Sequence, residues 1–146
     1  MKKVICIFCV CFLLLGCGCA KQAAKEPCLK PIEQFFDALN KGNYKKYAAC
    51  HVPQLEEIEG SYAFEGLYIE CRRDMLGEKS LYKIIEIMEL KEDAVLERLR
   101  AHCKKYAIEY DGFLLIRLDS NLPVLPHGCY LVQQDGKWKI LSWYPI

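Results

Sequence analysis

The strongest constraint on the fold of this chain is the dipeptide Asp135-Gly136, which stands between two runs of strand-forming residues. Asp and Gly tolerate the positive φ angles of a two-residue hairpin turn, and the pair is the strongest short-range hairpin signal in a sequence. The flanking runs, residues 128–134 and 137–144, are therefore predicted to be antiparallel strands joined by a tight turn. The C-terminal end of the chain thus contains an antiparallel sheet.

The residues that open the domain show the spacing of a helix instead. Four apolar residues follow the i, i+3, i+4, i+7 pattern of one helical face: Ile32, Phe35, Phe36 and Leu39. Pro31 suits the first turn of this helix, because its missing N–H needs no partner there. Residues 40–43 (Asn-Lys-Gly-Asn) predict its end, since Gly and Asn accept the left-handed conformation.

Three shorter helical segments follow. We expect a helix over residues 44–50, a further turn over residues 54–59, and a helix ending at Gly77 with Leu67, Cys71 and Met75 on one face. The pattern then changes to that of strands: residues 81–90 are rich in β-branched and aromatic residues, and residues 112–119 place Leu114, Ile116 and Leu118 on one side.

A charged helix that opens at Asp93 separates these two strands. Helices grouped first and antiparallel strands grouped last indicate an α+β fold. We therefore predict N-terminal helices packed on a curved, mostly antiparallel sheet, with an extra helix between strands.

The N-terminus has the features of an export signal. Lys2 and Lys3 precede residues 4–15, an unbroken run of twelve apolar residues. At the helical rise this run spans about 18 Å, which is short of the hydrocarbon core of about 30 Å. It is therefore predicted to be the apolar region of a secretory signal and not a membrane-spanning helix.

The run ends in Leu14-Leu15-Gly16-Cys17, which resembles a bacterial lipobox with Cys17 as the acylated residue. Cys19 is the alternative acylation site, and an ordinary cleaved signal peptide is a further alternative. We expect residues 1–16 to be a lipoprotein signal peptide, residues 17–30 a lipidated tether, and residues 31–146 a single domain. Two acyl chains give stable anchoring, so the expected location is the extracytoplasmic face of a bacterial cell membrane.

The charge of the chain bears on its partners. Twenty Lys and Arg against nineteen Asp and Glu give a formal net charge of +1. Nucleic-acid binding needs clustered basic charge, so no nucleic-acid partner is expected. The predicted partner is the membrane, reached through the N-terminal lipid.

The cysteines and histidines show no metal-ligand spacing. His51, His102 and His127 are far apart, and the mature domain has no C-x-x-C or H-x-x-x-H pair. No metal or cofactor is therefore expected. With Cys17 acylated, six cysteines remain for disulfides, and the sequence leaves both their presence and their connectivity open: Cys19, Cys28, Cys50, Cys71, Cys103 and Cys129.

Two segments resemble the nuclear transport factor 2-like (cystatin-like) superfamily, in its bacterial lipoprotein form. They are residues 35–44 (FFDALNKGNY) and residues 133–140 (QQDGKWKI). The resemblance implies an opening helix with its stop, a closing hairpin whose tryptophan faces the core, and a cone-shaped domain that can hold a pocket. It also implies a possible homodimer through the open sheet face. Relatives use the pocket in different ways, so the fold does not settle the function.

The candidate pocket residues lie on the first strand and on the hairpin. With strict alternation, the inner face of the first strand carries four of them, and the hairpin adds one: Tyr82, Ile84, Glu86, Met88 and Trp138. A carboxylate at Glu86 on an apolar face could serve as a general acid or base. The alternatives are that Lys83, Ile85 and Ile87 define the inner face, or that Glu86 lies at a solvated rim.

Alternation within the hairpin predicts that Trp138 points inward, because Lys137 and Lys139 take the opposite face. Trp143 then falls on the lysine-bearing face near the terminus. Replacing Trp138 with alanine is accordingly expected to destabilise the domain much more than replacing Trp143.

The function that the sequence favours is that of a non-enzymatic, lipid-anchored binding or protein-interaction module. Its expected ligand is an unknown protein or a small apolar molecule, and no catalytic residue is assigned. The alternative is a small isomerase- or lyase-like enzyme that uses a buried carboxylate, such as Glu86, in the cone pocket.

Overall fold

The computed structural model describes residues 26–91 and 94–143 of the 146-residue chain. The predicted signal peptide, Cys17, the residue Asp93 and Tyr144 lie outside the described residues. Helices form the first half of the domain: α2 (Glu26–Lys41), α3 (Tyr44–Ala49), α4 (Leu55–Glu59) and α5 (Ser61–Asp74). The second half holds four strands and one more helix: β1 (Tyr82–Glu89), α6 (Ala94–Lys105), β2 (Gly112–Ser120), β3 (Gly128–Gln134) and β4 (Lys137–Ser142).

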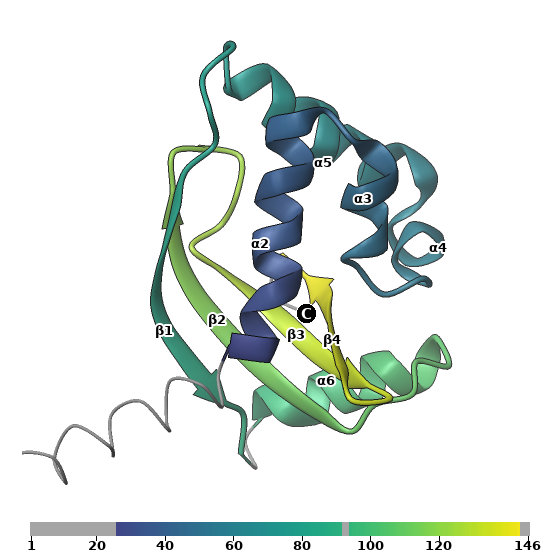
Figure 1. Ribbon diagram of the computed structural model, residues 1–146. Helices are drawn as coiled ribbons and strands as arrows, with labels where there is room; N and C mark the ends of the chain where they lie inside the picture. The colour runs from purple at the N-terminus through teal and green to yellow at the C-terminus, as the bar shows by residue number, and fades with distance from the viewer. Residues whose placement is uncertain (1–25, 92–93, 144–146) are drawn as a thin grey trace, which may run out of the picture.

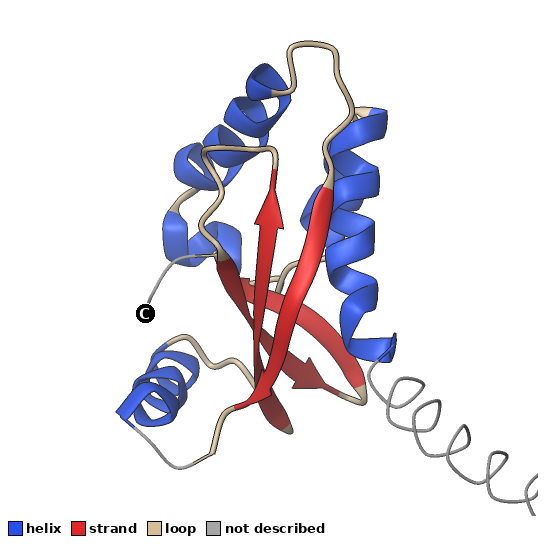
Figure 2. Cartoon of the chain, turned by 90° about the vertical axis from the view of Figure 1, so that its left-hand side faces the viewer, coloured by secondary structure: helices blue, strands red, loops and turns tan. Residues whose placement is uncertain are grey.

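The strands form one antiparallel sheet in the order β1-β2-β3-β4. The sheet is curved and does not close, and α2 crosses one of its faces (Figure 1). Helix α6 lies on the other side of the sheet from α2 (Figure 2). The predicted α+β class, the order of elements and the helix inserted between strands are therefore confirmed.

The closing hairpin has the turn that Asp135-Gly136 predicted. Asp135 and Gly136 have φ angles of 49° and 71°, and Gln134 pairs with Lys137 across the two-residue loop. Positive φ at both turn residues is the geometry that matches the twist of the flanking strands. This local signal therefore fixed both the position of the turn and the register beside it.

Helix α2 begins at Glu26, five residues before the predicted start at Pro31. Pro31 thus lies inside the helix, where it lacks the N–H that would bond the preceding turn. Cys28 is buried in the core and Leu29 packs against it. Apolar contacts therefore hold this extra turn despite the proline, and residues 26–30 belong to the domain and not to the predicted tether.

The register of β1 contains a bulge that the alternation rule could not foresee. Ile84 pairs with Leu118 and Glu86 pairs with Arg117, which makes Ile85 an extra residue in the strand. An extra residue in one strand shifts its alternation by one position. Glu86 therefore lies on the outer face, away from α2, and the prediction that it shares the inner face with Ile84 is wrong.

A second bulge lies in β4. Ile140 pairs with Leu131, but Ser142 pairs with Tyr130, so Leu141 is the extra residue of this strand. The shift moves Ser142 and Trp143 to the opposite faces from those that alternation predicts.

This second bulge changes the face on which Trp143 lies and leaves that of Trp138 unchanged. Trp143 turns to the inner face, where its ring centroid lies 4.6 Å from that of Phe35 and its exposed fraction is 3%. Trp138 lies on the same face but is only half-buried. The prediction that Trp138 points inward is therefore confirmed, but it is not the buried member of the pair, and the prediction that Trp143 takes the solvent-facing side is wrong.

The free edge of β4 is covered by the segment that follows α3. His51 forms a parallel bridge with Ile140, with backbone N–O distances of 2.9 Å on both sides, from Val52 to Ile140 and from Ile140 to Cys50. This contact places the His51 side chain beside Phe35, in the middle of α2, with ring centroids 5.8 Å apart. The edge of β4 is thus protected from pairing with another chain.

Candidate functional site

An open groove of about 810 Å³ lies where α2 begins and where β1 ends and β2 starts. The start of α2 lies in front of the lower part of the sheet (Figure 1). Most of the lining is apolar, with Glu89, Lys91 and Gln133 as its longer polar side chains. The lining residues are Cys28, Ile87, Met88, Glu89, Leu90, Lys91, Gly112, Phe113, Leu114, Gln133 and Trp138.

Three paired residues cross the sheet at this groove. Gly112 pairs with Gln133, and Gln133 pairs with Trp138, so the three lie side by side on β2, β3 and β4. A Cβ atom at Gly112 would lie 3.9 Å from both the Gln133 Oε1 atom and the Trp138 Cη2 atom. The glycine therefore leaves the wall open beside the indole ring, as glycine in a strand often does where a ligand approaches.

The five predicted pocket residues do not all meet at this groove. Met88 and Trp138 line it. Tyr82 stacks on Phe36 of α2 at a centroid distance of 4.2 Å, and Ile84 packs against the core, so their part of the inner face is filled by side chains.

Glu86 is placed where it cannot act as a buried carboxylate. Its side chain is 46% exposed and accepts a hydrogen bond from the Arg117 Nη1 atom at 3.3 Å. An exposed ion pair of this kind is well solvated and contributes little to stability. The alternative of an isomerase- or lyase-like enzyme was based on a buried carboxylate at Glu86. The bulge at Ile85 turns Glu86 to the outer face, so this residue does not support it.

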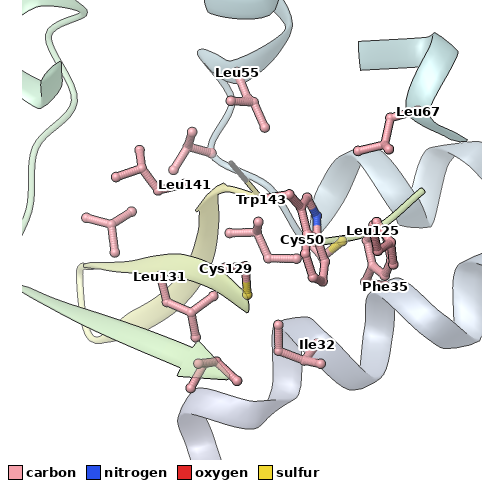
Figure 3. Packing of buried hydrophobic residues seen from close by; sticks show 14 of the residues in the cluster. Ile32, Phe35, Cys50, Leu55, Leu67, Leu125, Cys129, Leu131, Leu141 and Trp143 are labelled. Carbon is pink, nitrogen blue, oxygen red and sulfur yellow. The ribbon is translucent and has the colours of Figure 1, made fainter. Parts of the chain in front are cut away.

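The structure also brings together a cysteine and a histidine that the sequence reasoning passed over. The Cys50 Sγ atom lies 3.6 Å from the His51 Nδ1 atom, and both side chains are buried. Cys50 lies beside Trp143 and Phe35 in the core (Figure 3). Their adjacency in the sequence was the available signal, but spacing alone could not show that the two side chains point inward together.

The hydrogen bonds of this pair fix its protonation. Both Cys50 Sγ and His51 Nδ1 lie 2.8 Å from the backbone oxygen of Tyr47, and Trp143 Nε1 donates to His51 Nε2 at 3.4 Å. His51 therefore carries its proton on Nδ1 and accepts on Nε2. It has no free lone pair to take a proton from the thiol.

Burial keeps both groups of the pair neutral. It raises the pKa of the Cys50 thiol to about 12 and lowers the pKa of His51 to about 4. A thiol nucleophile needs the thiolate form at neutral pH. The pair therefore holds the end of α3 against the core and does not form a nucleophilic site.

The other buried cysteines are similarly protonated. Cys50, Cys71, Cys103 and Cys129 are free thiols in the core. Burial raises the pKa of Cys71 to about 12 and that of Cys103 to about 11, and it also raises the pKa of Cys129. In the structure, no disulfide joins any two of these four cysteines.

The described part of the chain has neither a candidate metal site nor a membrane-spanning helix. Within residues 26–91 and 94–143, no three His, Cys, Asp or Glu side chains come together in a way that could hold a metal ion. In the same part of the chain, no helix is both long and apolar enough to cross a bilayer.

No known protein-family model matches the chain, and no curated protein matches it either.

Proposed function

We propose that this chain is a lipid-anchored extracytoplasmic binding domain, and that the groove at the start of α2 takes a small apolar ligand. The observation that carries the proposal is the groove itself. Its volume of about 810 Å³ lies within the range of small-molecule sites. Its mostly apolar lining, with a few polar groups at Glu89, Lys91 and Gln133, is also typical of such sites.

The order and packing of the elements support a nuclear transport factor 2-like (cystatin-like) fold as part of this proposal. The opening helix α2 lies in the hollow of a curved antiparallel sheet, and the chain closes with a hairpin (Figure 1). The groove lies at the end of this sheet where α2 begins.

The proposed anchor determines what the groove faces. Eight residues, 18–25, separate the proposed acylated residue Cys17 from Glu26 at the start of α2. Even fully extended, they reach no more than about 29 Å. Because Cys28 of the first helical turn lines the groove, the anchor holds the groove close to the membrane surface.

The first prediction concerns the proposed lipid anchor at Cys17. Mass spectrometry of the N-terminal peptide from protein expressed in a bacterial host is expected to show a diacylated Cys17 and the loss of residues 1–16. The host must process lipoproteins, and a Cys17→Ser variant serves as the control that stays unmodified. A free thiol at Cys17, or acylation at Cys19, would contradict the assignment.

The second prediction concerns the groove and tests it by replacing Gly112, which lines it. A leucine at this position would project between Gln133 and Trp138, at a site where a Cβ atom itself meets only ordinary contacts. Gly112→Leu is therefore expected to fill the groove and to weaken binding of N-phenyl-1-naphthylamine, a neutral apolar fluorophore, by about tenfold or more. Fluorescence titration measures the dissociation constant.

A matched control separates this effect from a loss of folding. Gly66 lies in α5, at the far end of the molecule from the groove, and a Cβ atom there would meet nothing within 4 Å. Gly66→Leu is expected to leave the dissociation constant unchanged. Circular dichroism checks that both variants are folded. If folded Gly112→Leu binds the fluorophore as tightly as the wild type, the groove is not the binding site.

A further inference from the structure

A second, smaller hollow adjoins the groove on the other side of Trp138. It has a volume of about 330 Å³ and lies between the first turns of α2 and the start of β4. Trp138 lines both hollows. The lining residues of the second are Pro27, Lys30, Pro31, Gln34, Gly136, Lys137, Trp138 and Lys139.

This second hollow is basic. Lys30, Lys137 and Lys139 line it, and no carboxylate is among its lining residues in the described part of the chain. Lys30 and Lys137 are exposed, whereas Lys139 donates its Nζ hydrogen to the backbone oxygen of Ala49. Lys30 and Lys137 are therefore the cations best placed to meet a ligand.

Two carboxylates of α2, those of Glu33 and Asp37, are directed elsewhere. Asp37 forms an ion pair with Lys41 at 2.8 Å, one turn further along the helix. Burial raises the pKa of Tyr82 in β1, and the charge of Glu33 raises it further, so Glu33 lies on the side of α2 toward β1. The positive charge of Lys30 and Lys137 is thus not neutralised by these two acids.

We propose that the two hollows together bind one anionic acyl lipid of the membrane to which the protein is anchored. This inference rests on the proposed function, because it assigns the acyl chain to the apolar groove. The anionic headgroup lies between Lys30 and Lys137, and the indole of Trp138 separates chain from headgroup. Tryptophan suits this place, since it presents apolar surface together with a polar N–H.

Charge and position both favour this occupant. Lysine side chains bind phosphate and carboxylate groups as point charges. The short tether brings the groove to the leaflet surface, where acyl chains and anionic headgroups occur side by side. A purely apolar ligand would leave the basic hollow unused.

The test compares two soluble amphiphiles that share a twelve-carbon chain, dodecyl phosphate and dodecyl maltoside, below their micelle concentrations. The protein is the chain from residue 17 with Cys17→Ser, which contains every described core residue, Cys28 to Trp143. Isothermal titration calorimetry at low ionic strength is expected to show dodecyl phosphate binding about tenfold more tightly, as two charge-assisted contacts would give. High salt is expected to reduce this preference.

The double variant Lys30→Gln/Lys137→Gln is expected to lose the tenfold preference and to keep its affinity for dodecyl maltoside. The matched control is Lys104→Gln/Lys105→Gln, which removes the same charge from exposed positions on α6, on the other side of the sheet. This control is expected to keep the preference. If both double variants lose it equally, net charge is the cause and the headgroup site is refuted.

Gly112→Leu distinguishes failure of this inference from failure of the proposed function. If it leaves both amphiphiles bound, the groove proposal fails. If it abolishes both while Lys30→Gln/Lys137→Gln changes nothing, the groove stands and the headgroup site is refuted. Binding to phosphatidylglycerol vesicles is measured as well. If Lys30→Gln/Lys137→Gln loses this binding but keeps its preference for dodecyl phosphate, the two lysines contact the membrane surface and not a bound lipid. That result also overturns the inference.

Discussion

Replacing Trp143 with alanine is expected to lower the free energy of unfolding by about 3–5 kcal/mol, or to leave the domain unfolded. The side chain is 3% exposed, packs on the Phe35 ring at 4.6 Å, and donates a hydrogen bond to His51. Its removal leaves a cavity and an unsatisfied acceptor on the buried imidazole. The free energy of unfolding of such domains is about 5–15 kcal/mol in total, so this single change removes a large part of it.

Trp138→Ala is the matched comparison, because it removes the same atoms from the same hairpin. Trp138 is half-buried and lines two open hollows, so the loss is expected to be much smaller. Urea unfolding followed by circular dichroism measures both variants in the chain from residue 17 with Cys17→Ser. A larger loss for Trp138→Ala than for Trp143→Ala would contradict the register shift at Leu141.

Acid is expected to destabilise the domain through His51. Burial lowers the pKa of His51 to about 4 in the folded state, against about 6.5 in the unfolded chain. The unfolded state therefore binds the proton first, and the free energy of unfolding falls as the pH drops from about 6.5 to 4. The loss that this single group contributes is roughly 3 kcal/mol at the lower end of that window.

The variant that checks this prediction is His51→Gln, which removes the titration but keeps a donor and an acceptor. Urea unfolding at several pH values between 7 and 4 is expected to give a shallower dependence for this variant than for the wild type. His127→Gln is the control, because it removes an imidazole whose side chain is 87% exposed and not one in the core. An equal slope in wild type and His51→Gln would show that other groups cause the acid sensitivity.

The sequence by itself determined the class of the fold and the identity of its elements. Local signals were sufficient for this: the apolar spacing of residues 32–39 predicted a helix, and Asp135-Gly136 predicted the hairpin turn that the φ angles show. Helical periodicity and turn chemistry depend on neighbours in the chain, so they can be read without knowing the tertiary contacts.

The start of α2 was predicted less well. The pattern placed it at Pro31, because a proline is favourable in a first helical turn. The chain continues the helix back to Glu26, since Cys28 and Leu29 gain contacts with the core. Packing against the sheet thus outweighed the local preference, and it created the first wall of the groove.

The tertiary structure alone decided which side chains the two faces of the sheet carry. One extra residue at Ile85 turned Glu86 away from the interior, and one at Leu141 turned Trp143 toward it. A bulge forms where pairing with a neighbouring strand and packing against α2 favour a shifted register, and neither partner is adjacent in the sequence. The groove beside Gly112 and Trp138 depends on the same register, because it brings residues from three strands together with the start of α2.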